Sequence, residues 1–223
     1  MLFNSLEYLL FLPIVFILYW FIFNDQYKIQ NFLILVSSYV FYSWWDWRFL
    51  PLIFLSTIVD YYSGLKIDNS SNKRIKKTFL WASILFNVSI LGVFKYYNFF
   101  IDSWIDVLRM IGFQTQSVWT LNVILPVGIS FYTFQTMSYT IDIYNGRLKP
   151  TKDFISFASF VSFFPQLVAG PIERATNLLP QILTKRNFHY RNGVQGLRLI
   201  LWGMFKKVVI ILIALKIDEA PDK

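Results

Sequence analysis

The sequence contains no cysteine and few charged residues, and these two absences remove several classes of protein from consideration. Without cysteine among its 223 residues, the chain forms no disulfide, binds no metal through thiolates, accepts no S-acyl group and uses no cysteine nucleophile. Only 15% of the residues are charged, whereas soluble domains carry about a quarter. Metal-ligand spacings, glycine-rich phosphate loops and nucleophile elbows are also missing, so no metal site is predicted.

Apolar residues make up most of what is present. The chain is 56% hydrophobic and 20% aromatic, and apolar runs recur along its whole length. This distribution predicts an all-α fold, a polytopic transmembrane helix bundle that forms one membrane domain over residues 1–223. The expected spans are 4–23, 31–46, 49–66, 78–94, 121–141 and 194–215, with a broken or re-entrant helix over 154–172.

Basic residues gather in short segments between the apolar runs. The formal net charge is +8, but no basic helix or nucleic-acid-binding motif accompanies it, so no nucleic-acid partner is predicted. The segment Lys66–Lys77 holds five Lys/Arg and one Asp, which predicts a cytoplasmic loop. Counting back through three spans places the N-terminus outside the cytoplasm. Tyr96–Met110 mixes aromatic and charged residues, which is typical of a helix at the membrane interface.

The segment SFFPQLVAGPIER, Ser162–Arg174, interrupts an apolar run with two prolines and a glycine. Phe154–Phe164 would form about 16 Å of helix, which is half a bilayer. Pro165 lacks a backbone donor, so a straight helix is expected to fail there, and Gly170–Pro171 permits a second bend. Two interpretations stay open: a kinked ordinary span, or a re-entrant hairpin that walls an internal tunnel.

A stripe of polar and small residues runs along the fifth predicted span. Gly128, Tyr132, Gln135, Tyr139 and Asp142 recur at helical spacings of four, three, four and three. The opposite face carries Phe134, Met137 and Ile141. Helix-to-helix hydrogen bonding and a hydrated or substrate-lined cavity both explain such a stripe. Asp142 also fits a place at the inner interface.

A smaller polar face occurs on the third predicted span, where Ser56, Asp60 and Ser63 share one side. Asp60 lies about 9 Å of helical rise from Lys66, so a position just below the interface would also explain it.

Five stretches of this sequence resemble the membrane-bound O-acyltransferase family. They are SWWDWRF (Ser43–Phe49), FKYYNFF (Phe94–Phe100), LPVGISFYTFQTMSYTIDIYNGR (Leu125–Arg147), FFPQLVAGPIER (Phe163–Arg174) and GLRLILWGMFKKVVI (Gly196–Ile210). They extend from the first helices to the last, and they are most similar to the bacterial branch typified by the membrane subunit of alginate O-acetylation.

The resemblance implies a helical enzyme of the bacterial inner membrane with a tunnel through the bilayer. An acyl donor such as acetyl-CoA would be a substrate, with no bound cofactor. The acceptor would be an exported polysaccharide, sometimes through an extracytoplasmic acetyltransferase partner. The residues expected to line the tunnel are Gly128, Tyr132, Gln135, Tyr139, Asp142, Pro165, Gln166, Gly170 and Pro171.

The sequence departs from the family at its catalytic histidine. Family members are longer, and their histidine lies beyond the last residue of this chain. The one histidine here, His189, lies in NFHYRNG, a basic loop that does not match the family's histidine motif. No catalytic residue is therefore assigned, and we expect an N-terminal portion that transfers no acetyl group alone. A transporter, a membrane scaffold or an inert fragment are the alternatives.

Overall fold

The computed structural model describes residues 1, 3, 5–24, 26–111, 126–167, 170–171 and 173–210. These residues form helices and no strand, which confirms the predicted all-α class for the part of the chain described. They separate into two compact units. The larger comprises Met1 and Asp25–Lys185, and the smaller comprises Leu2–Asn24 and Arg186–Lys223.

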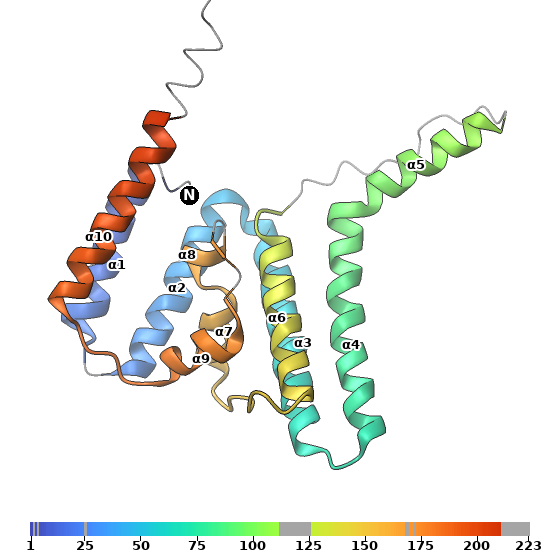
Figure 1. The fold of residues 1–223 in the computed structure, drawn as a ribbon, viewed down its shortest axis with the longest axis horizontal. Helices are drawn as coiled ribbons and strands as arrows, with labels where there is room; N and C mark the ends of the chain where they lie inside the picture. Colours follow the sequence, from blue (N-terminus) through green and yellow to red (C-terminus); the bar gives the residue numbers. More distant parts are fainter. Residues whose placement is uncertain are drawn as a thin grey trace, which may run out of the picture. The chain divides into compact units, whose positions relative to one another are not determined.

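The larger unit holds most of the helices. In chain order they are α2 (Tyr27–Asp46), the 3-10 turn η2 (Trp47–Phe49), α3 (Leu50–Asn69), α4 (Lys73–Leu91), the π-helical turn η3 (Gly92–Tyr96), α5 (Tyr97–Met110), α6 (Ile129–Tyr144), α7 (Phe154–Val161), α8 (Phe164–Leu167) and α9 (Ala175–Leu183) (Figure 1). The smaller unit holds α1 (Leu6–Ile17), η1 (Leu18–Ile22), α10 (Tyr190–Phe205) and η4 (Lys206–Ile210).

Short polar side chains begin several of these helices. The Asn72 side chain accepts a hydrogen bond from the Arg74 backbone N–H at 2.9 Å and thereby caps α4. Asp153 caps α7 in the same way by accepting from the backbone N–H groups of Ile155 and Ser156. Local sequence therefore sets where these helices start.

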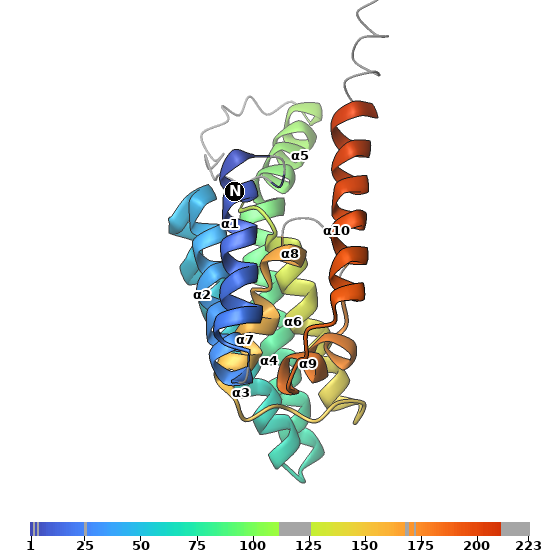
Figure 2. The same ribbon diagram turned by 90° about the vertical axis from the view of Figure 1, so that its left-hand side faces the viewer.

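In the larger unit, α6 packs beside α3 and α4 on one side and contacts α7 and α9 on the other. Figures 1 and 2 both show α6 and α3 side by side. The helices approach closely at Gly64 of α3, where an added Cβ would lie 2.8 Å from Cε1 of Tyr139. A glycine at this position thus lets the Tyr139 ring lie directly against the α3 backbone.

Each predicted span overlaps a helix, but whether these helices cross a membrane stays a prediction, and not all of them are strongly apolar. Lys73–Met110, which joins α4, η3 and α5, is the one stretch among the described residues that is long and apolar enough to cross a membrane by length and composition. Leu6–Ile22 (α1 with η1) and Phe154–Leu167 (α7 with α8) are shorter apolar helical stretches. Buried polar side chains on α2 and α3 lower the average hydropathy of those helices. Residues 4, 121–125 and 211–215 of the predicted spans lie outside the described residues.

The break in segment 154–172 lies earlier than Pro165, so the expected helix over Phe154–Phe164 is wrong. Helix α7 ends at Val161, where the Ser162 hydroxyl and backbone N–H both donate to the Ala158 carbonyl. Pro165 lies in the first turn of α8, where its missing N–H has no intrahelical partner to lose and its fixed φ suits the helix. Residues 168, 169 and 172 lie outside the described residues, and the re-entrant path stays a prediction.

Candidate functional site

Helix α6 carries four of the nine predicted site residues, and a glycine lies at each of its ends. Gly128 precedes the helix with a φ of 77°, in the left-handed region that favours glycine. Gly146 follows it with a φ of 72°, which lets the Arg147 N–H donate to the Asp142 carbonyl at 2.8 Å. The two glycines therefore fix where the helix begins and ends.

The polar stripe on α6 is buried, as its spacing suggested. Tyr132 and Tyr139 are fully buried, and Gln135 and Asp142 are nearly so. On the opposite face, the side chains of Phe134 and Ile141 are exposed. The helical spacing therefore identified the face of α6 that packs against the rest of the unit.

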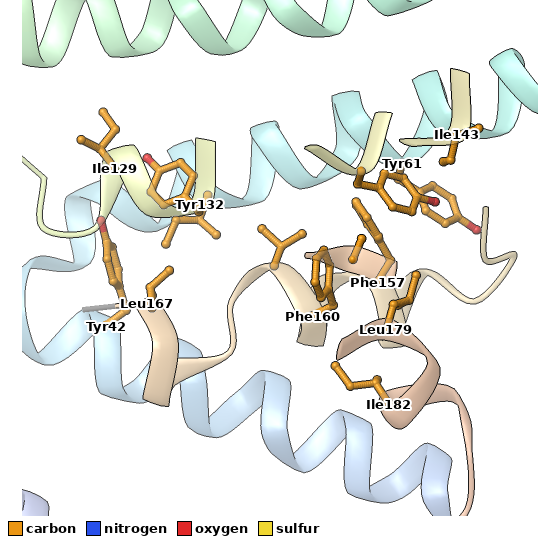
Figure 3. Packing of buried hydrophobic residues seen from close by; sticks show 14 of the residues in the cluster. Tyr42, Tyr61, Ile129, Tyr132, Ile143, Phe157, Phe160, Leu167, Leu179 and Ile182 are labelled. Atoms are coloured by element: carbon orange, nitrogen blue, oxygen red, sulfur yellow. The ribbon is translucent and has the colours of Figure 1, made fainter. Parts of the chain in front are cut away.

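This buried face of α6 lies against α7. The Gln135 side-chain amide donates to the Phe160 carbonyl at 2.9 Å, and the Tyr139 ring lies 4.5 Å from the Phe157 ring, centroid to centroid. Figure 3 shows Phe157 and Phe160 of α7 within the buried apolar cluster of the larger unit, to which α3, α8 and α9 also contribute side chains. Because α7 ends one residue after Phe160, Gln135 satisfies a carbonyl that has no intrahelical partner.

Replacing Gln135 with leucine is expected to lower the free energy of unfolding by about 1–2 kcal/mol, because the Phe160 carbonyl would be left buried without a donor. Gln181→Leu is the matched control: Gln181 is exposed on α9 and donates to the Asn177 carbonyl of its own helix. Chemical unfolding of both variants in detergent, followed by tryptophan fluorescence, measures the difference. Equal losses would show that the Gln135 bond contributes nothing specific.

The predicted residues of the broken segment occupy different environments. Pro165 is half-buried, and the Gln166 side-chain amide donates to the Pro171 carbonyl at 3.0 Å. Gly170 is half-buried and Pro171 is exposed. The start of α6 comes close to α8, since a Cβ on Gly128 would lie 2.4 Å from the Leu167 carbonyl oxygen.

Asp142 lies at the other end of α6, about 20 Å along the helix from Gly128. There its carboxylate is 3.9 Å from the Arg147 guanidinium. The predicted residues of α6 thus follow the length of one helix interface and do not gather at one point. Whether they line a hydrated tunnel stays a prediction.

A second buried polar face of α6 was missed in the sequence. It contacts α3 and α4, and polar side chains from all three helices form what we call the Asp60 cluster. The cluster comprises Ser56 and Asp60 of α3, Ser83 and Asn87 of α4, and Thr136 and Thr140 of α6. Ser83 and Asn87 lie four residues apart on α4, and Thr136 and Thr140 do so on α6. These four-residue spacings were the sequence signal from which a shared polar face on each helix could have been predicted.

Asp60 is fully buried at the centre of this cluster. Its depth relative to the membrane interface stays a prediction. The Ser83 hydroxyl donates to one carboxylate oxygen, and the Asn87 amide donates to the other at 2.8 Å. Asn87 in turn accepts from the Ser56 hydroxyl at 2.8 Å. The cluster therefore connects α3, α4 and α6 through side chains that are uncharged apart from one carboxyl group.

Three further buried hydroxyl groups have no hydrogen-bond partner in the described part of the chain: those of Tyr42, Tyr132 and Thr133. Two of them belong to α6, and Figure 3 shows Tyr42 and Tyr132 at the end of the buried apolar cluster near Ile129. The single histidine, His189, is exposed at the start of α10 in the smaller unit.

Comparisons with known proteins give a consistent group of relatives. The chain is 37% identical over 212 residues to the "Probable alginate O-acetylase AlgI" of Pseudomonas aeruginosa, covering 94% of this chain and 40% of that protein. It is 38% identical over 213 residues to the protein of the same name from Pseudomonas putida, covering 94% of this chain and 42% of that protein. A "Peptidoglycan O-acetyltransferase" of Helicobacter pylori is 35% identical over 203 residues, covering 79% of this chain and 37% of that protein.

These relatives confirm the resemblance that the sequence motifs predicted. The chain spans about two fifths of the length of the curated alginate O-acetylases that it matches. No family model matches the chain. No solved structure matches it either.

Proposed function

We propose that this chain, which is related over nearly its whole length to alginate O-acetylases, forms the N-terminal part of a membrane-bound O-acyltransferase. The enzyme would transfer acetyl groups to an exported polysaccharide. The observation that carries the proposal is the similarity to several proteins named as O-acetylases and to one named as a peptidoglycan O-acetyltransferase. The stretch Leu125–Arg147, on which the resemblance partly rests, includes α6, which packs centrally in the larger unit.

The protein would cross the bacterial inner membrane several times. Exposed apolar side chains support this placement, because they recur at helical spacing on the outer faces of α4 (Trp81, Leu85 and Val88) and α2 (Phe32 and Val36). The basic turn between α3 and α4 would lie in the cytoplasm, which puts the N-terminus outside.

The acetyl donor, acetyl-CoA or a similar thioester, would be a substrate and not a bound cofactor. The proposed conduit runs beside α6 and the broken segment and is lined by the nine residues predicted from the sequence. The unpartnered hydroxyl of Tyr132 supports it, because a passing polar group could accept a hydrogen bond from it. The acceptor would be the polysaccharide itself or an extracytoplasmic acetyltransferase partner that relays the group.

No described residue is assigned as the catalytic base. By the resemblance, the base would be a histidine in a part of the longer enzyme that this chain does not match. The described helices would then hold and orient substrates, and proton abstraction from the acceptor hydroxyl would occur elsewhere.

The proposal is tested in a bacterium whose own O-acetylase gene has been deleted. We expect residues 1–223 alone to restore no acetyl ester on the exported polysaccharide. Co-expression with a segment that supplies the remaining length of the relatives is expected to restore it. Acetyl esters are measured by alkaline release of acetate and by nuclear magnetic resonance of the polysaccharide. Acetylation by residues 1–223 alone would contradict the predicted division of roles, and no acetylation under either condition, with both segments present in the membrane, would contradict the function.

A further inference from the structure

Helix α5 leaves the bundle of the larger unit. The π-helical turn η3 separates it from α4, and Figure 1 shows α5 turned away from the direction of α4. Local π-helical turns are a recognised cause of such bends. Among the described elements, α5 packs extensively against η3 alone. Most of its surface is therefore left uncovered by the rest of the unit.

The exposed surface of α5 has a distinct apolar side. Its members have between 46% and 87% of their surface exposed and are Phe99, Phe100, Trp104, Val107 and Met110. At about 100° per residue they cover an arc of roughly 140°. Asp102, Asp106 and Arg109 fall within about 60° on a separate edge, and Ile105 is buried on the remaining side. The helix thus has an exposed apolar side, a charged edge and a side that includes the buried Ile105.

The position of α5 along the chain fixes its depth in a membrane. The 19 residues from Thr78, which follows the basic turn, to Tyr96 at the end of η3 would extend about 28 Å as a helix, close to the thickness of the hydrocarbon core. Therefore η3 and the start of α5 come at the opposite surface. In η3, the Lys95 amine donates to the Ser130 hydroxyl at 3.1 Å and lies 5.4 Å from the Tyr96 ring centroid.

Tryptophan residues mark the same end of the unit. Figure 1 shows the end of α2 and the end of α4 at the same end, opposite the α3–α4 turn. Trp44, Trp45 and Trp47 lie at this end of α2, and each has more than half of its surface exposed. Tryptophan is enriched at the boundary between lipid and water, so this end fits the headgroup layer.

We propose that α5 lies in the headgroup layer of the outer leaflet, parallel to the membrane. Phe99, Phe100 and Trp104 enter the acyl-chain boundary, while Asp102 and Asp106 face water. The outer leaflet is favoured by the depth of α5, which follows one membrane-thick helix from the basic turn proposed to be cytoplasmic. The inference rests on the membrane placement proposed above. It adds a lipid-binding helix. The turn before this helix, η3, is hydrogen-bonded to the first turn of α6 through Lys95 and Ser130.

The absence of native cysteine allows a clean test by single-cysteine scanning. The variants are Phe100→Cys, Trp104→Cys and Val107→Cys on the apolar side, with Asp102→Cys and Asp106→Cys on the charged edge. Leu85→Cys on α4 serves as the control for the bilayer interior, and Ser71→Cys in the basic turn as the control for the cytoplasmic side. Each variant is expressed in spheroplasts and treated with a membrane-impermeant maleimide. The purified variants are then spin-labelled in lipid nanodiscs for accessibility to oxygen and to a nickel chelate.

We expect positions 102 and 106 to react in intact spheroplasts, and positions 100, 104 and 107 to react several-fold more slowly. In nanodiscs, spin labels at the apolar positions should be more accessible to oxygen than to the nickel chelate, as is also expected for the label at Leu85→Cys. Equal reaction at all five positions would overturn the inference and show that α5 is surrounded by water. Equally slow reaction at all five would also overturn it and show that protein covers the helix. Reaction at 102 and 106 only after permeabilisation, as for Ser71→Cys, would refute the outer leaflet. Rapid reaction of Leu85→Cys would instead refute the membrane placement itself.

Discussion

Replacing Gly128 with alanine is expected to lower the free energy of unfolding by about 3 kcal/mol or more. The φ of 77° is strained for any residue with a Cβ, which contributes about 1–2 kcal/mol. The added Cβ would also lie 2.4 Å from the Leu167 carbonyl oxygen, a backbone atom that moves only if α8 moves. Both effects act at the contact between the start of α6 and the broken segment.

Gly146→Ala separates these two effects. Gly146 has nearly the same φ, 72°, but no atom lies within 4 Å of the position that a Cβ would take. Its replacement should therefore cause only the conformational loss of about 1–2 kcal/mol. Chemical unfolding in detergent, followed by tryptophan fluorescence, compares the two variants. Equal losses would mean that the close approach of Gly128 to Leu167 does not contribute to stability.

The Gly128 contact shows which parts of the site could be predicted from the sequence. Spacing along α6 identified the buried face, because helical geometry alone decides which residues share a side. It could not show that Gly128 lies against Leu167, since these residues are 39 positions apart and meet only through the path of α7 and α8. Sequence periodicity thus describes one helix at a time, and contacts between helices need the fold.

The position predicted for the break before α8 was wrong for a related reason. Proline was expected to end a helix, which is its effect in a helix interior. In this protein α7 already ends at Val161, and the Phe164 backbone N–H donates to the Ser38 hydroxyl of α2 at 3.1 Å. That tertiary bond satisfies a backbone donor at the start of α8, so Pro165 occupies a first turn instead. The sequence indicated that a break exists, and the partner on α2 helps to set its position.

The Asp60 cluster was the least predictable feature because its members lie on three helices. On α3 alone, Asp60 and Ser56 form a weak polar face, and nothing in that segment indicates that α4 supplies their partners. The structure shows that Asn87 connects both of them, accepting from Ser56 and donating to Asp60 at 2.8 Å each. A buried carboxyl group without such donors would be strongly destabilising, so α4 and α3 are expected to depend on each other in folding.

Asn87→Leu is therefore expected to lower the free energy of unfolding by about 2–3 kcal/mol, since Asp60 and Ser56 each lose a partner inside the bundle. Leucine has a similar volume, so the loss reports on hydrogen bonding and not on a cavity. Asn177→Leu, at an exposed position on α9, is the matched control and should change stability by less than about 0.5 kcal/mol. Both are measured by chemical unfolding in detergent.

The double variant Asp60→Leu/Asn87→Leu identifies the cause of that loss. If Asn87 acts by satisfying the Asp60 carboxylate, removing both groups should destabilise the protein by less than the sum of the two single changes, because no carboxylate remains without its partner. A strictly additive double variant would show that the two side chains act independently. In that case the three helices would be held together by their apolar contacts, and the Asp60 cluster would only fill the space between them.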